Sequence, residues 1–354
     1  MDENFKGYGG SENIKDTEIK DNDVEKFSDP FDLYSNLAEK QDQKTLESTT
    51  PLIGKDAVDD LIKSDKNKSL TIEELVNELD SLIGLNLVKS EIKALLQFVK
   101  VQELRREKKI SISKPALHSV FFGSPGTGKT TIARLYGQML SAMGLLSKGH
   151  LVETDRSGLI GGYIGQTAIK TDEKIKEALG GVLFIDEAYS LSKGDDSRWD
   201  YGDEAIATLL KRMEDFRDDF VVIVAGYPEP MGRFLSSNEG LKSRFSTFIH
   251  FDDYSPLEMA EIFKQLCIKE NYAPTEEALE FVFTTIDYNY SIRDKSFGNA
   301  RYVRNLFETV IKNQAFRIGT TMSDPTTEEL RIILQSDIPF VTPSDTKSNQ
   351  TFRF

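Results

Sequence analysis

Gly123-Ser-Pro-Gly-Thr-Gly-Lys129-Thr130 is the stretch of sequence that decides the fold. It matches the pattern G-x-x-x-x-G-K-[ST], in which a glycine-rich loop wraps around phosphates and points its backbone amides at them. The apolar run 118–122 precedes this loop and a helical pattern starts at Lys129, so the loop lies between a strand and a helix. Because the N-terminus of a helix adds partial positive charge at the same place, we predict a phosphate-binding loop and not an ordinary glycine-rich turn.

Each position of the loop has an expected task. Lys129 would place a full charge on the β- and γ-phosphates, and the hydroxyl of Thr130 would bind Mg²⁺. The predicted ligand is therefore ATP with Mg²⁺. The residues expected to contact it here are Gly123, Ser124, Pro125, Gly126, Thr127, Gly128, Lys129, Thr130 and Thr131.

A second motif, Val182-Leu-Phe-Ile-Asp186-Glu187, is an apolar strand pattern that ends in two carboxylates. Adjacent carboxylates in a buried strand are unfavourable unless they meet a cation. At the carboxyl end of a parallel strand they would face the crevice in which α/β proteins bind ligands. We expect Asp186 to hold Mg²⁺ and Glu187 to orient and polarise the attacking water.

The sequence around both motifs alternates between strand and helix. Apolar runs typical of strands are residues 118–122, 150–152, 182–185, 220–225 and 248–251, and helical patterns are 129–143, 168–179 and 204–216. Such alternation predicts an α/β fold, with a parallel sheet between helices and right-handed connections. From Pro256 onward the strand patterns stop. Residues 257–269, 276–286, 300–318 and 327–334 are expected to be helical, which predicts a small all-helical lid domain.

Ordered structure is expected to begin near Leu70. Thr71-Ile-Glu-Glu74 is a capping box, which starts a helix, and residues 86–108 form a second helical stripe after a break at Gly84. The predicted domains are an acidic tail over 1–68, an α/β domain over 69–254, the helical domain over 255–340 and a flexible C-terminus over 341–354. The tail is poor in apolar residues, so we expect it to be largely disordered, as a solvated segment or as a docking segment for a partner.

Bulk composition excludes several classes of protein. The chain has 354 residues and a net charge of −14, which argues against general binding of nucleic acid. The single cysteine, Cys267, excludes an internal disulfide and is expected in the core. No apolar run approaches the roughly 18 residues that span a bilayer, and the N-terminus lacks a secretory pattern. We expect a cytoplasmic protein without a membrane span.

His118, His150 and His250 have no metal-binding spacing and are expected to be structural.

The motifs together resemble the AAA+ superfamily of P-loop ATPases. The likeness covers residues 70–340 and is greatest to the branch that contains CbbX-type rubisco activases, stage V sporulation protein K and the ATPase domain of EccA proteins. Beside the two motifs above, it depends on the segments Gly161-Gly-Tyr-Ile-Gly-Gln-Thr167, Ile185-Asp-Glu-Ala-Tyr189, Asp200-Tyr-Gly-Asp-Glu-Ala-Ile206, Ala225-Gly-Tyr227, Ser243-Arg-Phe245 and Gly298-Asn-Ala-Arg301.

This resemblance implies that Arg244 is a catalytic arginine finger, which reaches the γ-phosphate bound in a neighbouring subunit. The alternative is an arginine in a surface salt bridge. A finger that acts between subunits requires a ring of head-to-tail contacts, and hexamers are usual in the family. The chain is then its own partner, in a homohexameric ring.

The resemblance also implies contacts from outside the phosphate loop. Arg301 would contact the nucleotide from the lid, with Arg304 as a competing candidate, and Ile83 and Gly84 would pack around the adenine base. Many family members carry a polar residue, called sensor 1, where this chain has Ala225-Gly-Tyr227. That departure leaves sensor 1 unassigned, with Tyr227 as either a hydroxyl donor or a simple turn residue.

Tyr163 and Ile164, between glycines, resemble the pore loop with which the family grips a polypeptide. Tyr163 could instead pack back on its own domain. Residues 193–202 would form a second loop near the channel.

Three functions fit these features. The first is an ATP-hydrolysing ring motor that remodels or threads a protein client. The second is a nucleotide-gated assembly scaffold or switch, related to sporulation or type VII secretion, without threading. The third, a nucleic-acid motor, is disfavoured by the negative charge.

Overall fold

The computed structural model describes residues 70–110, 117–163, 165–192, 201–245 and 247–339. The chain divides into two units, 1–68 and 69–354, and only the second contains described residues. The expectations for the tail 1–68, for Ile164, for residues 193–200 of the second loop and for the C-terminal segment 341–354 therefore lie outside the described part.

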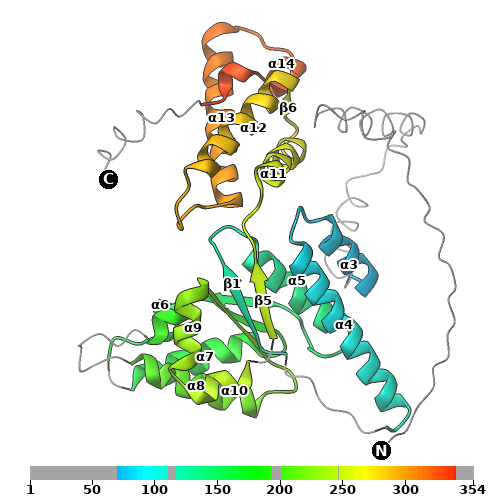
Figure 1. Cartoon of the computed structure of the whole chain (residues 1–354), viewed down its shortest axis with the longest axis vertical. Helices are drawn as coiled ribbons and strands as arrows, with labels where there is room; N and C mark the ends of the chain where they lie inside the picture. The colour runs from blue at the N-terminus through cyan, green and yellow to red at the C-terminus, as the bar shows by residue number, and fades with distance from the viewer. Residues whose placement is uncertain (1–69, 111–116, 164, 193–200, 246, 340–354) are drawn as a thin grey trace, which may run out of the picture. The chain divides into compact units, whose positions relative to one another are not determined.

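A five-stranded parallel sheet forms the centre of the α/β domain (Figure 1). Its strands are β1 (Ser119–Gly123), β2 (Leu151–Thr154), β3 (Val182–Ile185), β4 (Val221–Gly226) and β5 (Thr247–Phe251). Their order across the sheet is β2-β3-β4-β1-β5, so β4 separates β1 from β3. The predicted α/β class is confirmed.

Helices cover both faces of this sheet (Figure 1). Successive strand residues point to opposite faces, so in β4 Ile223 joins one apolar core while Val222 and Val224 join the other. The first core packs under α3 (Ile72–Ser81), α4 (Asn86–Glu107) and α5 (Lys129–Ala142). The second packs under α6 (Arg156–Leu159), α7 (Gln166–Ala178), η1 (Ala188–Ser192), α8 (Gly202–Asp215), α9 (Pro228–Ser236) and α10 (Glu239–Arg244).

The turn between α3 and α4 follows the sequence prediction. Thr71 and Glu74 form the expected capping box at the start of α3. Gly84 and Leu85 both have positive φ angles, 59° and 57°, which ends one helix and starts the next. Leu82 and Leu85 are partly buried against the first core.

The lid is helical, as predicted, with one small exception. Its helices are α11 (Pro256–Lys269), α12 (Glu276–Ser291), α13 (Ala300–Thr321), α14 (Thr327–Arg331) and the short η2 (Gln335–Asp337). We expected no strand after Pro256, but β6 (Ala273–Pro274) pairs in parallel with β7 (Ile332–Ile333). The helix expected over 327–334 therefore ends at Arg331, because Ile332 turns into this ladder. None of the described helices has the length and apolarity that crossing a bilayer requires.

Candidate nucleotide site

The strand order brings the two sequence motifs to one place. The phosphate loop follows β1, the acidic pair follows β3, and β4 runs between these strands. In the strand register Phe122 pairs with Gly226 and Ile185 pairs with Val224, so all three strands end within a few residues of one another at the same edge of the sheet. The carboxyl edge of a parallel sheet is where such folds bind ligands, and Gly226 and Tyr227 at the end of β4 lie between the motifs.

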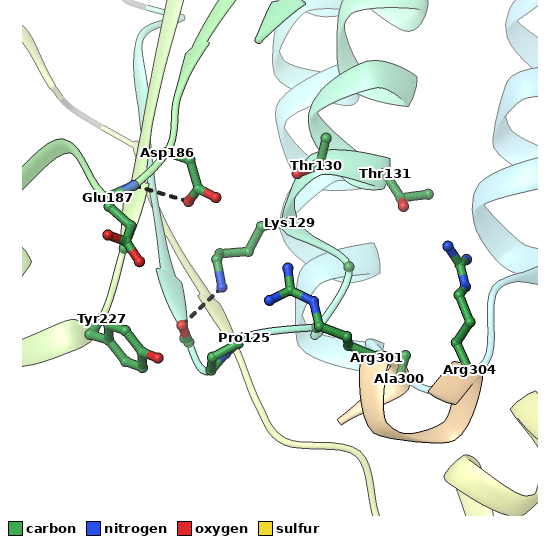
Figure 2. A pocket seen from close by; sticks show the side chains of 14 residues that line it. Pro125, Lys129, Thr130, Thr131, Asp186, Glu187, Tyr227, Ala300, Arg301 and Arg304 are labelled. Atoms are coloured by element: carbon green, nitrogen blue, oxygen red, sulfur yellow. Dashed lines mark hydrogen bonds between the residues drawn. The ribbon is translucent and has the colours of Figure 1, made fainter. Parts of the chain in front are cut away.

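A cavity of about 410 Å³ occupies this edge (Figure 2). Most of the predicted contacts line it together, from the phosphate loop, the acidic pair and the start of α13. The lining residues are Gly123, Pro125, Gly126, Gly128, Lys129, Thr130, Thr131, Asp186, Glu187, Gly226, Tyr227, Ala300, Arg301 and Arg304.

Lys129 points from the start of α5 into this cavity and bonds to the loop itself. Its Nζ donates to the carbonyl oxygens of Gly123 at 2.9 Å and Ser124 at 2.7 Å. Burial lowers the pKa of Lys129 below its ordinary value, while the charge of Asp186 opposes that shift. A bound phosphate would supply stronger, charge-assisted partners for the same ammonium group.

Glu187 has an unusual backbone at the end of the acidic motif. Its φ angle is 48°, in the left-handed region that side chains other than glycine seldom occupy. The backbone N–H of Glu187 donates to Asp186 Oδ1 at 3.0 Å. Burial raises the pKa of the nearby Tyr189 phenol to about 12, and the charge of Glu187 adds to that shift. Backbone strain of this kind gathers at functional sites, because the surrounding structure must maintain it.

The donor atoms around Lys129 suit a magnesium ion that arrives with phosphates. Thr130 offers a hydroxyl and Asp186 a carboxylate, and both line the cavity. Mg²⁺ takes oxygen ligands and is usually held by one or two carboxylates together with substrate phosphates. The described residues contain no cluster of three or more His, Cys, Asp or Glu side chains that could hold a metal by itself. These residues therefore fit Mg²⁺ as a companion of the nucleotide.

Two arginines of α13 line the cavity, and their directions differ. Figure 2 shows Arg301 pointing toward Lys129, whereas Arg304 points toward the side of Thr131. The charge of Arg301 contributes to the lowered pKa of Lys129, which agrees with that orientation. Arg301 therefore lies nearer the position expected for phosphate.

Four of the predicted contacts do not line this cavity. Thr127 is buried and its hydroxyl donates to the Ser124 carbonyl at 2.9 Å, so it holds the loop in shape. Gly84 lies instead against Tyr254 and Glu258 at the start of the lid. A separate hollow of about 280 Å³ adjoins this turn. It is lined by Leu85, Asn86, Leu87, Val88, Asp252, Asp253, Tyr254 and Glu258 and contains neither Ile83 nor Gly84.

Arg244 lies at the opposite edge of the sheet. Phe245, beside it, packs against His118 with ring centroids 6.3 Å apart. His118 precedes β1 while the phosphate loop follows it, so a five-residue strand, roughly 16 Å, separates Arg244 from its own cavity. Arg244 Nη2 is 3.4 Å from Glu214 Oε2, and its buried Nε has no hydrogen-bond partner among the described residues.

Tyr163 points into solvent. It lies between α6 and α7, and its side chain is 74% exposed, so it does not pack back on its own domain. A Cβ added at Gly162 or Gly165 would meet no atom within 4 Å, which shows how open the loop is. Arg156 of α6 donates to the backbone carbonyl of Ser190, which follows the acidic motif closely in the chain.

His118 and Cys267 have buried positions, as expected for structural residues. His118 is buried and its Nδ1 accepts the N–H of Val222 at 3.0 Å. Cys267 is fully buried, and burial raises the pKa of its thiol to about 12.

Sequence reasoning missed several residues at the site. Tyr189 and Glu214 contact predicted catalytic residues, and Asn299 contacts the phosphate loop. Asn299 and Tyr189 lie inside family-like motifs, which was the available signal. Glu214 carries no such signal, because it is one acidic residue among many on a helix surface.

Family models match both structured domains. Residues 119–253 match the ATPase family associated with various cellular activities (AAA), and residues 255–349 match the AAA lid domain.

Three relatives fall in the branch that the sequence motifs predicted. Stage V sporulation protein K of Bacillus subtilis (strain 168) is 42% identical over 261 residues, covering 73% of this chain and 80% of that protein. The chloroplastic ribulose bisphosphate carboxylase/oxygenase activase of Cyanidioschyzon merolae is 43% identical over 271 residues, covering 76% and 92%. The ESX-1 secretion system protein EccA1 of Mycobacterium tuberculosis is 39% identical over 279 residues, covering 77% of this chain and 49% of EccA1. With its phosphate loop, acidic pair and helical lid, the chain belongs to the AAA family of ATPases.

Proposed function

We propose that this chain is an ATP-driven ring motor that remodels a protein client by drawing it through a central pore. The observation that carries the proposal is Tyr163, a large aromatic side chain held in solvent between glycines. An exposed aromatic ring offers a large apolar contact surface, which can pack against a polypeptide without requiring one sequence.

Hydrolysis is expected to use the residues of the cavity in distinct roles. Lys129 would hold the β- and γ-phosphates, and Glu187 would orient and polarise the attacking water. Thr130 and Asp186 would hold Mg²⁺, which neutralises charge on the phosphate oxygens when bound. Arg301 would add charge from the lid.

Arg244 is expected to act on the nucleotide of a neighbouring subunit. It lies a strand's length from its own cavity, and its buried Nε lacks a partner within the described chain. A guanidinium keeps its charge at every physiological pH and suits phosphate oxygens. Such a contact requires a closed, head-to-tail assembly, and we propose the hexamer that is usual in this family.

The link from cavity to pore loop is short. Glu187 precedes η1, whose Ser190 carbonyl accepts from Arg156 of α6, and α6 leads to Tyr163. Lys170 of α7 donates to the carbonyl of Ser157 at 2.6 Å, which joins both sides of the loop. A shift near Glu187 would therefore reach Tyr163 through these hydrogen bonds from side chains to backbone carbonyls.

A binding experiment with unfolded casein as the model polypeptide tests the proposal. In a Glu187→Gln background, which should hold ATP without turnover, we expect ATP-dependent capture of labelled casein, measured by fluorescence anisotropy. Adding Tyr163→Ala should abolish capture without changing nucleotide affinity. Ile169→Ala is the matched control, since Ile169 is 62% exposed on the neighbouring α7.

Undiminished capture by the Tyr163→Ala protein would remove the threading motor. Activity in the native setting that survives Glu187→Gln would instead favour a nucleotide-gated scaffold.

We further infer a cytoplasmic location from the single cysteine and from the reliance on ATP.

A further inference from the structure

A single buried amide, that of Asn299, joins the lid to the phosphate loop. Asn299 lies immediately before α13 and has no solvent exposure. Its Nδ2 lies within hydrogen-bond distance of three carbonyl or carboxylate oxygens: Pro125 O at 3.3 Å, Asp253 Oδ1 at 3.0 Å and Phe297 O at 3.3 Å. Its Oδ1 accepts the backbone N–H of Tyr254 at 3.1 Å. One side chain thus connects the phosphate loop, the link after β5 and the lid.

The backbone around Asn299 makes the same connection. The N–H of Ala300 donates to the carbonyl of Gly126 at 3.2 Å. A Cβ placed on Gly126 would lie 2.0 Å from the carbonyl oxygen of Gly298, so the two backbones are in direct contact. The first turn of α13, which carries Arg301, therefore lies on the phosphate loop.

Asn299 holds this position in an unfavourable conformation. Its φ and ψ angles are 47° and −123°, and the N–H of Arg301 donates to the carbonyl of Gly298 at 2.8 Å. These are the angles and the hydrogen bond of a type II′ turn, whose first central position is normally glycine. In this chain the glycine is Gly298, one residue earlier, and the strained position itself is occupied by Asn299. Strain that a fold retains at a site indicates a functional demand, and here the demand is for an amide.

An amide suits this place because the surrounding groups require both a donor and an acceptor. Pro125, Asp253 and Phe297 offer only acceptor oxygens, while Tyr254 offers a donor. Asparagine is short enough to serve both from within the turn.

We propose that Asn299 is the positioning residue of the lid arginine, fixing the first turn of α13 on the phosphate loop so that Arg301 faces the phosphates. This inference rests on the proposed role of Arg301. Arg301 is two residues from the anchor, and Figure 2 shows it pointing toward Lys129. When the phosphate loop changes shape with nucleotide, Asn299 would carry that change into the lid.

Steady-state ATP hydrolysis by the full chain provides the test. Asn299→Gly removes the amide but suits the turn, so we expect a folded protein whose kcat falls about tenfold, as Arg301→Ala also does. If Asn299 acts through Arg301, the two losses are not additive, and the double variant should match Arg301→Ala alone. Gln314→Ala is the control, because it removes a buried amide of the same helix that donates within the lid, to Leu330 O at 2.8 Å and Ile332 O at 3.3 Å. It should lower the Tm and leave kcat unchanged.

A second variant, Asn299→Asp, adds the pH dependence of kcat as a readout. A variant that is merely less stable would not change this dependence. Asn299→Asp places a buried carboxyl beside Asp253, with Arg293, Lys129 and Arg301 as the nearby cations. Burial and the like charge should raise the pKa of the introduced group. Protonated, it can donate to Asp253; ionised, it repels Asp253. The kcat of Asn299→Asp relative to Asn299→Gly should therefore fall as pH rises.

The outcomes separate the inference from the function on which it rests. Normal hydrolysis by Asn299→Gly beside an impaired Arg301→Ala would overturn the positioning role alone, as would additive losses or a pH-independent ratio for Asn299→Asp. Normal hydrolysis by Arg301→Ala would overturn the proposed role of Arg301 itself. If Asn299→Gly fails to fold, the pH dependence of Asn299→Asp relative to wild type decides.

Discussion

Glu187 shows at the scale of one residue how this site is built. Glu187 follows the end of β3 by two residues with a left-handed backbone, and its backbone N–H donates to Asp186 Oδ1 at 3.0 Å. Together these features fix the carboxylate at the rim of the cavity that Lys129 enters. A carboxylate oriented by such contacts can polarise a water without moving during the reaction.

The change Glu187→Gln tests that role. The amide keeps the shape but cannot accept a proton, so we expect kcat to fall by about 10²–10⁴ while ATP still binds. Turnover and fluorescent-nucleotide affinity, measured on one preparation, check both parts. Lys129→Ala is the contrasting variant, and it should lose affinity as well as turnover.

His118 makes the stability of the α/β domain depend on pH. Burial lowers its pKa from 6.5 to about 4. The unfolded chain therefore takes up a proton near pH 6.5 and the folded chain only near pH 4, so stability is lost as pH falls between these values. At about 1.4 kcal/mol per pKa unit, this one group accounts for at most about 3.5 kcal/mol.

Urea unfolding at pH 7 and pH 5 can isolate this contribution. Asn at position 118 can still accept the N–H of Val222 but does not titrate, so His118→Asn should unfold with a smaller difference between the two pH values than wild type. An unchanged difference in His118→Asn would contradict the assignment.

At the scale of elements, Gly126 serves the phosphate loop and the lid together. Its φ angle is 70°, and an added Cβ would lie 2.0 Å from Gly298 O and 2.9 Å from Arg301 N. The contact between the phosphate loop and the first turn of α13 therefore requires glycine for two separate reasons.

A comparison of Gly126→Ala with a second glycine variant should separate the cost of the positive φ angle from the cost of crowding against the lid. Gly144 has a similar φ of 73° but open space around it, so Gly144→Ala carries only the backbone cost, about 1 kcal/mol. We expect Gly126→Ala to be destabilised further and to lose ATP hydrolysis, whereas Gly144→Ala keeps it. Thermal unfolding and turnover provide the comparison, and equal behaviour of the two variants would show that the lid contact is unimportant.

At the scale of the whole molecule, the proposed assembly depends on where Arg244 lies. If Arg244 is the catalytic arginine, a subunit that has this arginine a strand's length from its own cavity would need a neighbour to complete the site. Arg244 Nη2 lies 3.4 Å from Glu214 Oε2, a contact that would hold the guanidinium in place for the proposed phosphate of a neighbour.

Mixing two inactive proteins tests this arrangement. Arg244→Ala should lose turnover by about 10³ or more yet bind ATP, as Glu187→Gln does. In mixed rings the cavity of an Arg244→Ala subunit can meet the intact arginine of a Glu187→Gln neighbour, so activity should reappear. Lys242→Ala, which changes a nearby cation on the same helix, should stay active. No recovery on mixing would indicate that Arg244 only pairs with Glu214.

The sequence alone determined those features that depend on neighbours in the chain. The phosphate loop, the acidic pair, the capping box at Thr71 and the alternation of strands and helices all have local physical causes. Local pattern also predicted the helical lid. It missed β6 and β7, because two-residue strands are too short to show a period, and the partner across that ladder decides whether they form.

Only the tertiary structure decided which residues meet at the site. The strand order places Tyr227 between the two motifs and keeps Arg244 away from them. The burial of Asn299 and the crowding at Gly126 arise where the lid folds back onto the phosphate loop. These contacts join segments far apart in the chain, so their energies depend on packing geometry that no local pattern contains.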